Sequence, residues 1–175
     1  MQEHIQPIIQ RIGETDQLYL QGNTPELALE RAELRLQLVT LSLIRQEQIH
    51  FLQEAIVLLE QGRIEFEEMP TRLYIQLSLH LAKAYMMYYE ISKEQRFAII
   101  TQQILKKITT DENGDIYFFL AYASAVKNEP SFTRHWLNKY SQSKEFDFAL
   151  LQKHPSFEQY HQESWFQQLL KNKLH

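Results

Sequence analysis

Glycine and proline are rare in this chain, and they stand between long stretches of residues that favour helices. The four glycines are Gly13, Gly22, Gly62 and Gly114, each at a place where a helix is expected to begin or end. Valine, which favours strands, occurs only at Val39, Val57 and Val126. Because Gln, Glu, Leu, Ala, Lys and Arg fill the stretches between these breaks, the pattern predicts an all-α fold.

Capping residues and turn residues divide the chain into expected helices. Thr24 and Pro25 form a helix start, and Pro70 and Pro130 begin later helices. The expected helices cover 2–12, 25–61, 70–89, 92–109, 115–127 and 130–140, followed by three short ones at 146–152, 155–160 and 164–172. LRLQLVTLSL alternates partly like a strand, but helical flanks and two leucine stripes favour a central helix. The stretch 25–61 is either one helix or a pair that breaks near His50.

Composition and charge exclude several classes of function. The net charge is −4 and the cations are scattered, whereas nucleic-acid binders usually carry a basic face. The chain has no cysteine, no apolar run long enough to span a membrane, and no apolar segment typical of a secretory signal at its start. Phosphate-binding, dinucleotide-binding and hydrolase motifs are also missing. We therefore expect a cytoplasmic protein without a cofactor or catalytic residues, which binds neither nucleic acid nor membrane.

The segment DIYFFLAYASAVKNEPSFTRHWLNKY resembles a tetratricopeptide repeat, a pair of antiparallel helices. Large and small residues occupy the positions that this family reserves for them: Tyr117, Leu120, Ala121 and Ser124 on the first helix, and Thr133, Leu137 and Tyr140 on the second. Tyr140 and Ser124 depart from the family pattern, which prefers a smaller residue and an aromatic one there. Asn128 lies in the turn, where asparagine tolerates a left-handed backbone. The preceding pair, 71–109, matches through Leu81, Ala82, Tyr85 and Ala98.

The tail, EFDFALLQKHPSFEQYHQESWFQQLLKN, is similar to the closing segment of many bacterial tetratricopeptide proteins. A helical array must seal its open apolar end, and short helices with aromatic residues can do so. The resemblance covers residues 71–172. It implies a short right-handed array of stacked antiparallel helix hairpins, capped by short C-terminal helices. We expect a single domain over 1–175, with divergent helices at 1–70, two repeat-like pairs at 71–142 and the cap at 143–175.

The same resemblance implies a function in binding other proteins. One face of each first helix lines a concave groove in this family, and the register places eight residues there: Gln76, Leu79, Lys83, Met86, Met87, Phe118, Tyr122 and Val126. Only Lys83 is basic, so a charged C-terminal peptide is not the expected ligand. The resemblance instead predicts an apolar peptide or helix of another protein, bound for scaffolding, assembly or neutralisation.

Two alternatives remain open at the level of sequence. His154, Glu158 and His161 share one face if their segment is a single helix, which would suit a small metal-binding or hydrolytic enzyme. Pro155, however, indicates that a helix starts after His154, so His154 would cap it. In the second alternative the apolar groove pairs two copies of the chain, and the protein is a self-associating homodimer.

Overall fold

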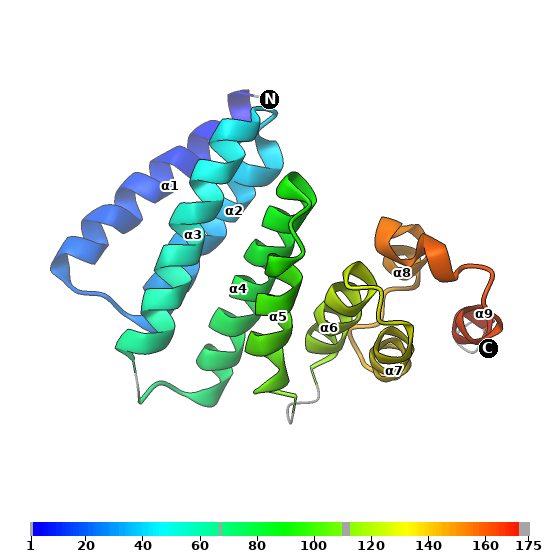
Figure 1. Cartoon of the computed structure of the whole chain (residues 1–175). Helices are drawn as coiled ribbons and strands as arrows, with labels where there is room; N and C mark the ends of the chain where they lie inside the picture. Colours follow the sequence, from blue (N-terminus) through cyan, green and yellow to red (C-terminus); the bar gives the residue numbers. More distant parts are fainter. Residues whose placement is uncertain (1, 67, 110–112, 172–175) are drawn as a thin grey trace. The chain divides into compact units, whose positions relative to one another are not determined.

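The computed structural model describes residues 2–66, 68–109 and 113–171 of the chain. These residues form nine α-helices and one short 3₁₀ helix, and no β-strand occurs among them. Neighbouring helices pack against one another as hairpins joined by short loops (Figure 1). The predicted all-α fold is therefore confirmed.

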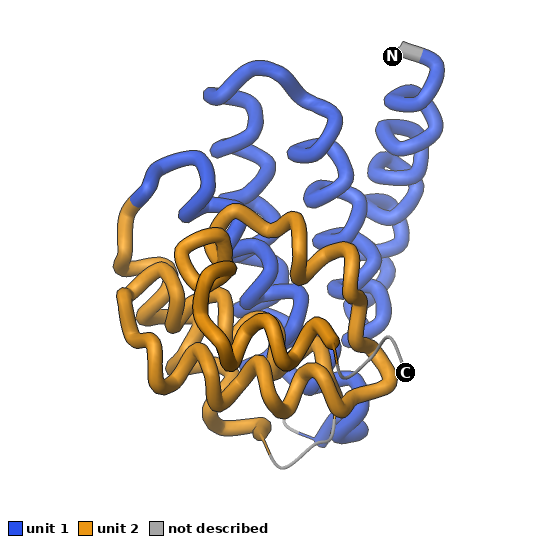
Figure 2. Tube along the Cα trace, turned by 90° about the vertical axis from the view of Figure 1, so that its right-hand side faces the viewer, with its two compact units in different colours: residues 1–93 blue, residues 94–175 orange. Residues whose placement is uncertain are grey.

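The chain divides into two compact units, shown in separate colours in Figure 2. Unit 1 comprises residues 1–93 and unit 2 comprises residues 94–175. The boundary falls inside the segment 71–109, which the sequence predicts to be one repeat-like helix pair. The two helices of that pair thus belong to different units, and each unit is described below by itself.

Unit 1 contains four long helices, with α2 at its centre (Figure 1). They are α1 (Gln2–Gln21), α2 (Pro25–Leu41), α3 (Arg45–Glu65) and α4 (Thr71–Ser92). Helix α2 packs against each of the other three. This explains its two leucine stripes, because Leu34 and Leu38 of one stripe and Leu36 of the other are all buried. The predicted central helix is confirmed.

The stretch 25–61 is a hairpin and not one long helix. Helix α2 ends at Leu41 and α3 begins at Arg45, so the break lies before the expected position at His50. Side chains stabilise the connection: Gln48 Nε2 donates to the carbonyl of Ser42 at 2.8 Å, and Ser42 Oγ donates to Glu47 at 2.9 Å. These local bonds replace helical backbone bonds at the corner.

Two glycines expected to stop helices lie inside them. Helix α1 continues beyond Gly13 to Gln21, and α3 continues beyond Gly62 to Glu65. Thr15 and Asp16 lie beyond Gly13, and their contacts favour continuation of α1: Thr15 is buried, and Asp16 pairs with two arginines of α2. The predicted start of α2 is confirmed, because Thr24 Oγ1 accepts a hydrogen bond from the Leu27 amide at 3.1 Å.

Unit 2 begins with three helices, of which α6 is the most deeply buried. They are α5 (Arg96–Lys106), α6 (Gly114–Val126) and α7 (Pro130–Ser141), and α6 packs against both neighbours. The turn between α6 and α7 has the expected left-handed residue, since Asn128 has a φ of 55°. Asn113 caps α6 by accepting from the Asp115 amide at 2.9 Å, so the helix begins at Gly114, one residue before its expected start.

Three short elements close unit 2: α8 (Phe148–Lys153), the 3₁₀ helix η1 (Pro155–Tyr160) and α9 (Ser164–Lys171). Helix η1 packs on α6, and α9 packs on α7. Phe157 and Phe166 are completely buried, and Trp165 lies 5.4 Å from the ring of Tyr160. The aromatic residues of the tail therefore build part of the core, as expected of a cap.

None of the described helices is both long enough and apolar enough to cross a membrane.

Candidate functional site

The α4 part of the predicted groove is only partly accessible. Lys83 is exposed, while Gln76, Leu79 and Met87 are half-buried. Met86, in contrast, is 1% exposed and belongs to the core. A partner could therefore reach the α4 stripe through the other four residues but not through Met86, and the role of these four remains a prediction.

The α6 part of the predicted groove is covered by the chain itself. Phe118 and Tyr122 are buried, and Val126 is half-buried. The ring of His154 lies 4.4 Å from that of Tyr122 and 5.6 Å from that of Phe118, measured between centroids. Phe157 adds a further contact with Phe118 at 6.1 Å. The C-terminal segment thus occupies the face that the register assigned to a ligand, and Phe118 and Tyr122 are core residues instead.

The three residues of the metal-binding alternative do not converge. His154 caps η1, because its Nδ1 accepts a hydrogen bond from the Ser156 amide at 3.2 Å. Burial among the aromatic rings lowers the pKa of His154 below its ordinary value. Glu158 is exposed, and His161 packs against Phe166 with 5.1 Å between centroids. Within the described ranges no three His, Cys, Asp or Glu side chains are grouped closely enough to hold a metal ion.

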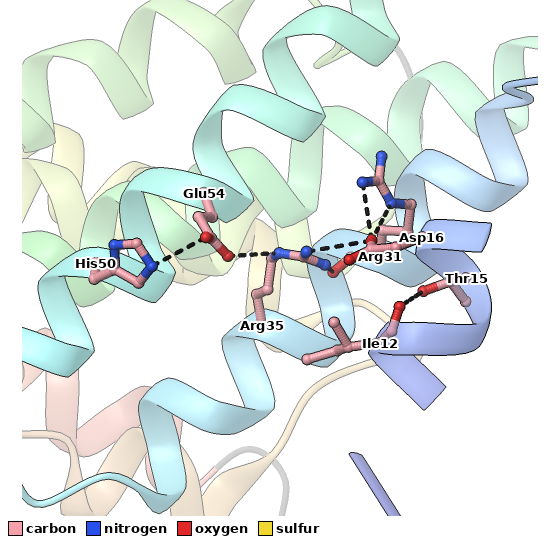
Figure 3. Close-up of polar contacts among 7 residues, drawn as sticks. All are labelled: Ile12, Thr15, Asp16, Arg31, Arg35, His50 and Glu54. Atoms are coloured by element: carbon pink, nitrogen blue, oxygen red, sulfur yellow. Dashed lines mark hydrogen bonds and ion pairs between the residues drawn. The ribbon is translucent and has the colours of Figure 1, made fainter. Parts of the chain in front are cut away.

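The most extensive polar cluster lies in unit 1 and joins three helices (Figure 3). Arg31 and Arg35, one turn apart on α2, both contact Asp16 of α1. Arg35 also donates to Glu54 of α3 at 2.8 Å, and His50 Nε2 lies 3.0 Å from the other Glu54 oxygen. The cluster therefore runs from α1 across α2 to α3.

Both guanidinium groups are largely removed from water. Arg31 is 9% exposed and Arg35 is 7% exposed, while the side chains of Asp16 and Glu54 remain about two-fifths exposed (42% and 39%). A buried cation is tolerated only when paired and hydrogen-bonded, so each arginine depends on its carboxylate partner. Arg35 additionally donates to the carbonyl of Arg31 at 3.1 Å, which orients both side chains.

A groove of about 430 Å³ opens above this cluster. Seven residues of α2 and α3 line it: Arg31, Arg35, His50, Gln53, Glu54, Val57 and Leu58. Val57 is 53% exposed, and Tyr19 of α1, which is 42% exposed, stacks on the Arg31 guanidinium at 4.3 Å. The groove combines fixed charged groups with accessible apolar side chains, which is the composition of a binding surface. We call it the arginine groove.

The residues of the arginine groove were not among the predicted site residues, but the sequence contains a signal for them. In LERAELRLQL, Arg31 and Arg35 are four residues apart within a helix that carries apolar residues on two sides. One turn of spacing places both cations on the same face, and that face had to be partly buried. The carboxylates that pair with them come from other helices, and no spacing along the chain identifies those partners.

The chain was compared with protein families, curated sequences and solved structures. None of them matches it.

Proposed function

We propose that this chain is a protein-interaction module of the tetratricopeptide-like helical-repeat type, and that unit 1 binds an amphipathic segment of another protein in the arginine groove. The observation that supports this proposal is that accessible apolar side chains lie beside the two arginines of the groove. Val57 and Tyr19 are both about half exposed; Val57 lines the groove together with the two arginines, and Tyr19 stacks on Arg31. Arginine and aromatic residues together are typical of the centres of protein interfaces.

An amphipathic segment suits this surface better than a purely apolar one. Its apolar side chains would cover Val57 and Leu58, while its polar side chains would meet the charged cluster. A wholly apolar segment would remove Glu54 and His50, whose side chains are 39% and 64% exposed, from water without new hydrogen bonds, which is costly. The half of the predicted groove on α6 cannot bind a partner segment, because η1 already covers it.

Site-specific photo-crosslinking tests the proposal. A photoreactive residue at position 57 should capture one dominant protein from a lysate of the source cell. The same residue at position 132 serves as a matched control, because Phe132 is 52% exposed but lies on α7 of unit 2. The captured protein is then titrated against the purified chain by calorimetry.

The titration decides the outcome. We expect Val57→Glu to weaken binding of the captured protein by roughly tenfold or more, since it places a charge against the apolar side chains of the partner. Phe132→Glu should leave the affinity unchanged. Capture of the same proteins at both positions, or equal affinities for the two variants, would contradict the proposal.

A further inference from the structure

Helix α1 is held to unit 1 with very little apolar burial. Among its described side chains Thr15 alone is buried, although the helix spans 20 residues. Several apolar side chains of α1 remain exposed, including Ile9, Leu18 and Leu20. Helix α4, of similar length, has eight buried residues. Since buried apolar area is the main favourable term in helix packing, α1 is attached far more weakly than α4.

Charged contacts take the place of the missing apolar contacts. Asp16 Oδ1 lies 3.0 Å from Nε and 2.9 Å from Nη2 of Arg31, and 3.4 Å from Nη2 of Arg35. Arg11 forms a second, more exposed pair with Glu30 of α2, with contacts of 2.6 and 3.1 Å. The more exposed pair of Arg11 and Glu30 weakens most with salt and the partly buried contact of Asp16 weakens less, whereas apolar packing is not screened.

The main ionic contact, drawn in Figure 3, joins a partly exposed aspartate to two arginines that are buried. The Asp16 side chain is already 42% exposed and would be hydrated easily if α1 moved away. Arg31 and Arg35 are buried and would lose a carboxylate that neutralises them, leaving Glu54 as a partner for Arg35. An uncompensated cation in such a position strongly favours a replacement carboxylate. The surface of α2 beneath α1 is therefore complementary to an acidic helix.

The connection between α1 and α2 permits such a movement. Only residues 22–24 separate the two helices, and Gly22 has a φ of +143°, which residues other than glycine rarely adopt. A glycine hinge lets α1 pivot while the rest of unit 1 stays packed.

We propose that α1 is an exchangeable helix: the surface of α2 beneath it binds an amphipathic helix of a partner protein, which brings a carboxylate to Arg31 and Arg35 in place of Asp16. This inference rests on the proposed function and names the chemistry of the partner. We expect the partner helix to resemble α1, which carries an aspartate together with isoleucines and a tyrosine. While bound, α1 competes with the partner and lowers its apparent affinity.

Hydrogen exchange on the unmodified chain gives the first test. Exchange of α1 amides, followed by mass spectrometry, should become at least several-fold faster when NaCl is raised from 50 mM to 1 M, because the Debye length falls from above 10 Å to about 3 Å. Exchange in α2 and α3 should change little. Equal protection of α1 at both salt concentrations would overturn the inference.

A peptide of residues 3–21, labelled with a fluorophore, gives the second test. Fluorescence anisotropy should show that full-length chain carrying Asp16→Lys binds this peptide roughly tenfold more tightly than chain carrying Gln17→Lys, since only the first loses its own contact with the arginines. Gln17 is exposed on the same helix and receives the same lysine, which raises the charge by one where Asp16→Lys raises it by two. Circular dichroism checks that both variants are folded. A peptide that itself carries Asp16→Lys should not bind either chain.

The outcomes separate this inference from the proposed function. If both chains bind the peptide equally, or neither does, α1 is not exchanged for an acidic helix, and capture at position 57 can still support the arginine groove. If the peptide binds as expected but position 57 captures no specific protein, the exchange of α1 stands and the proposed function is contradicted.

Discussion

Gly62 of α3 lies directly against Ala28 of α2, so closely that a Cβ added to Gly62 would stand 3.2 Å from the Ala28 Cβ. The same Cβ would meet Leu77 of α4 at 3.6 Å. Both Gly62 and Ala28 are buried, and α2, α3 and α4 pack against one another at this point. The missing side chain thus sets how closely three helices of unit 1 approach.

We expect Gly62→Val to destabilise unit 1 by about 1–3 kcal/mol, because the added methyl groups overpack the contact with Ala28. Urea denaturation followed by circular dichroism measures this change. Gln61→Val is the control, since Gln61 is the exposed neighbour and receives the same β-branched residue in the same helix. Equal losses for the two variants would contradict this account, because helix propensity alone would favour valine over glycine at position 62 and disfavour it at position 61.

Gly13 presents the opposite case, because nothing lies within 4 Å of the position its Cβ would take. It is exposed and lies within α1, where glycine costs backbone entropy. We expect Gly13→Ala to stabilise α1 by about 0.5–1 kcal/mol, seen as slower amide exchange along that helix. Gly22→Ala should instead lower stability, since alanine is strained at a φ of +143°. Faster exchange in α1 of the Gly13→Ala variant would refute this account.

The fold class and most helix limits could be predicted because they depend on local signals. Thr24, Pro25 and Pro130 mark helix starts because the first turn of a helix has backbone amides without partners in the helix. This is true of a helix in any fold. Gly62 could not be interpreted in this way. A glycine serves equally as a C-terminal cap or as a point of close approach, and only the position of Ala28 on another helix decides between them.

The candidate site could be predicted less well, because it depends on contacts between distant parts of the chain. The register placed Phe118 and Tyr122 correctly on one face of α6, but it could not show that His154 and Phe157 cover that face. Ser124 is a residue that the sequence pattern alone would count as a mismatch. It departs from the repeat pattern because its hydroxyl accepts a hydrogen bond from the buried Gln102 at 3.1 Å, a reason visible only in three dimensions.

His154 should make the stability of unit 2 depend on pH. Burial lowers its pKa, so the folded chain binds a proton less readily than the unfolded chain, whose histidines titrate near about 6.5. The contribution of neutral His154 is therefore complete above about pH 6.5 and is lost as the pH falls through that value towards the lower folded pKa. Protonation would also remove the acceptor for the Ser156 amide. Thermal unfolding at pH 5.0 and 7.5 measures the effect.

His154→Asn provides the control for this dependence. Asparagine can still accept from the Ser156 amide as a helix cap, but it does not titrate. We expect this variant to show a smaller loss of stability between pH 7.5 and 5.0 than the unmodified chain. His135→Asn, at an exposed site on α7, should keep the full dependence. An unchanged pH dependence in the His154→Asn variant would exclude His154 as its origin.

Phe157 and Phe132 allow a direct test of whether the C-terminal segment is part of the core. Phe157 is completely buried beneath α6, where it contacts Phe118, whereas Phe132 is 52% exposed on α7. Phe157→Ala should destabilise unit 2 by about 3–5 kcal/mol, through lost burial and the cavity it leaves. Phe132→Ala, the same substitution in the same unit, should change stability by about 0.5 kcal/mol or less. Urea denaturation measures both, and similar values for the two variants would mean that η1 does not pack on α6 in solution.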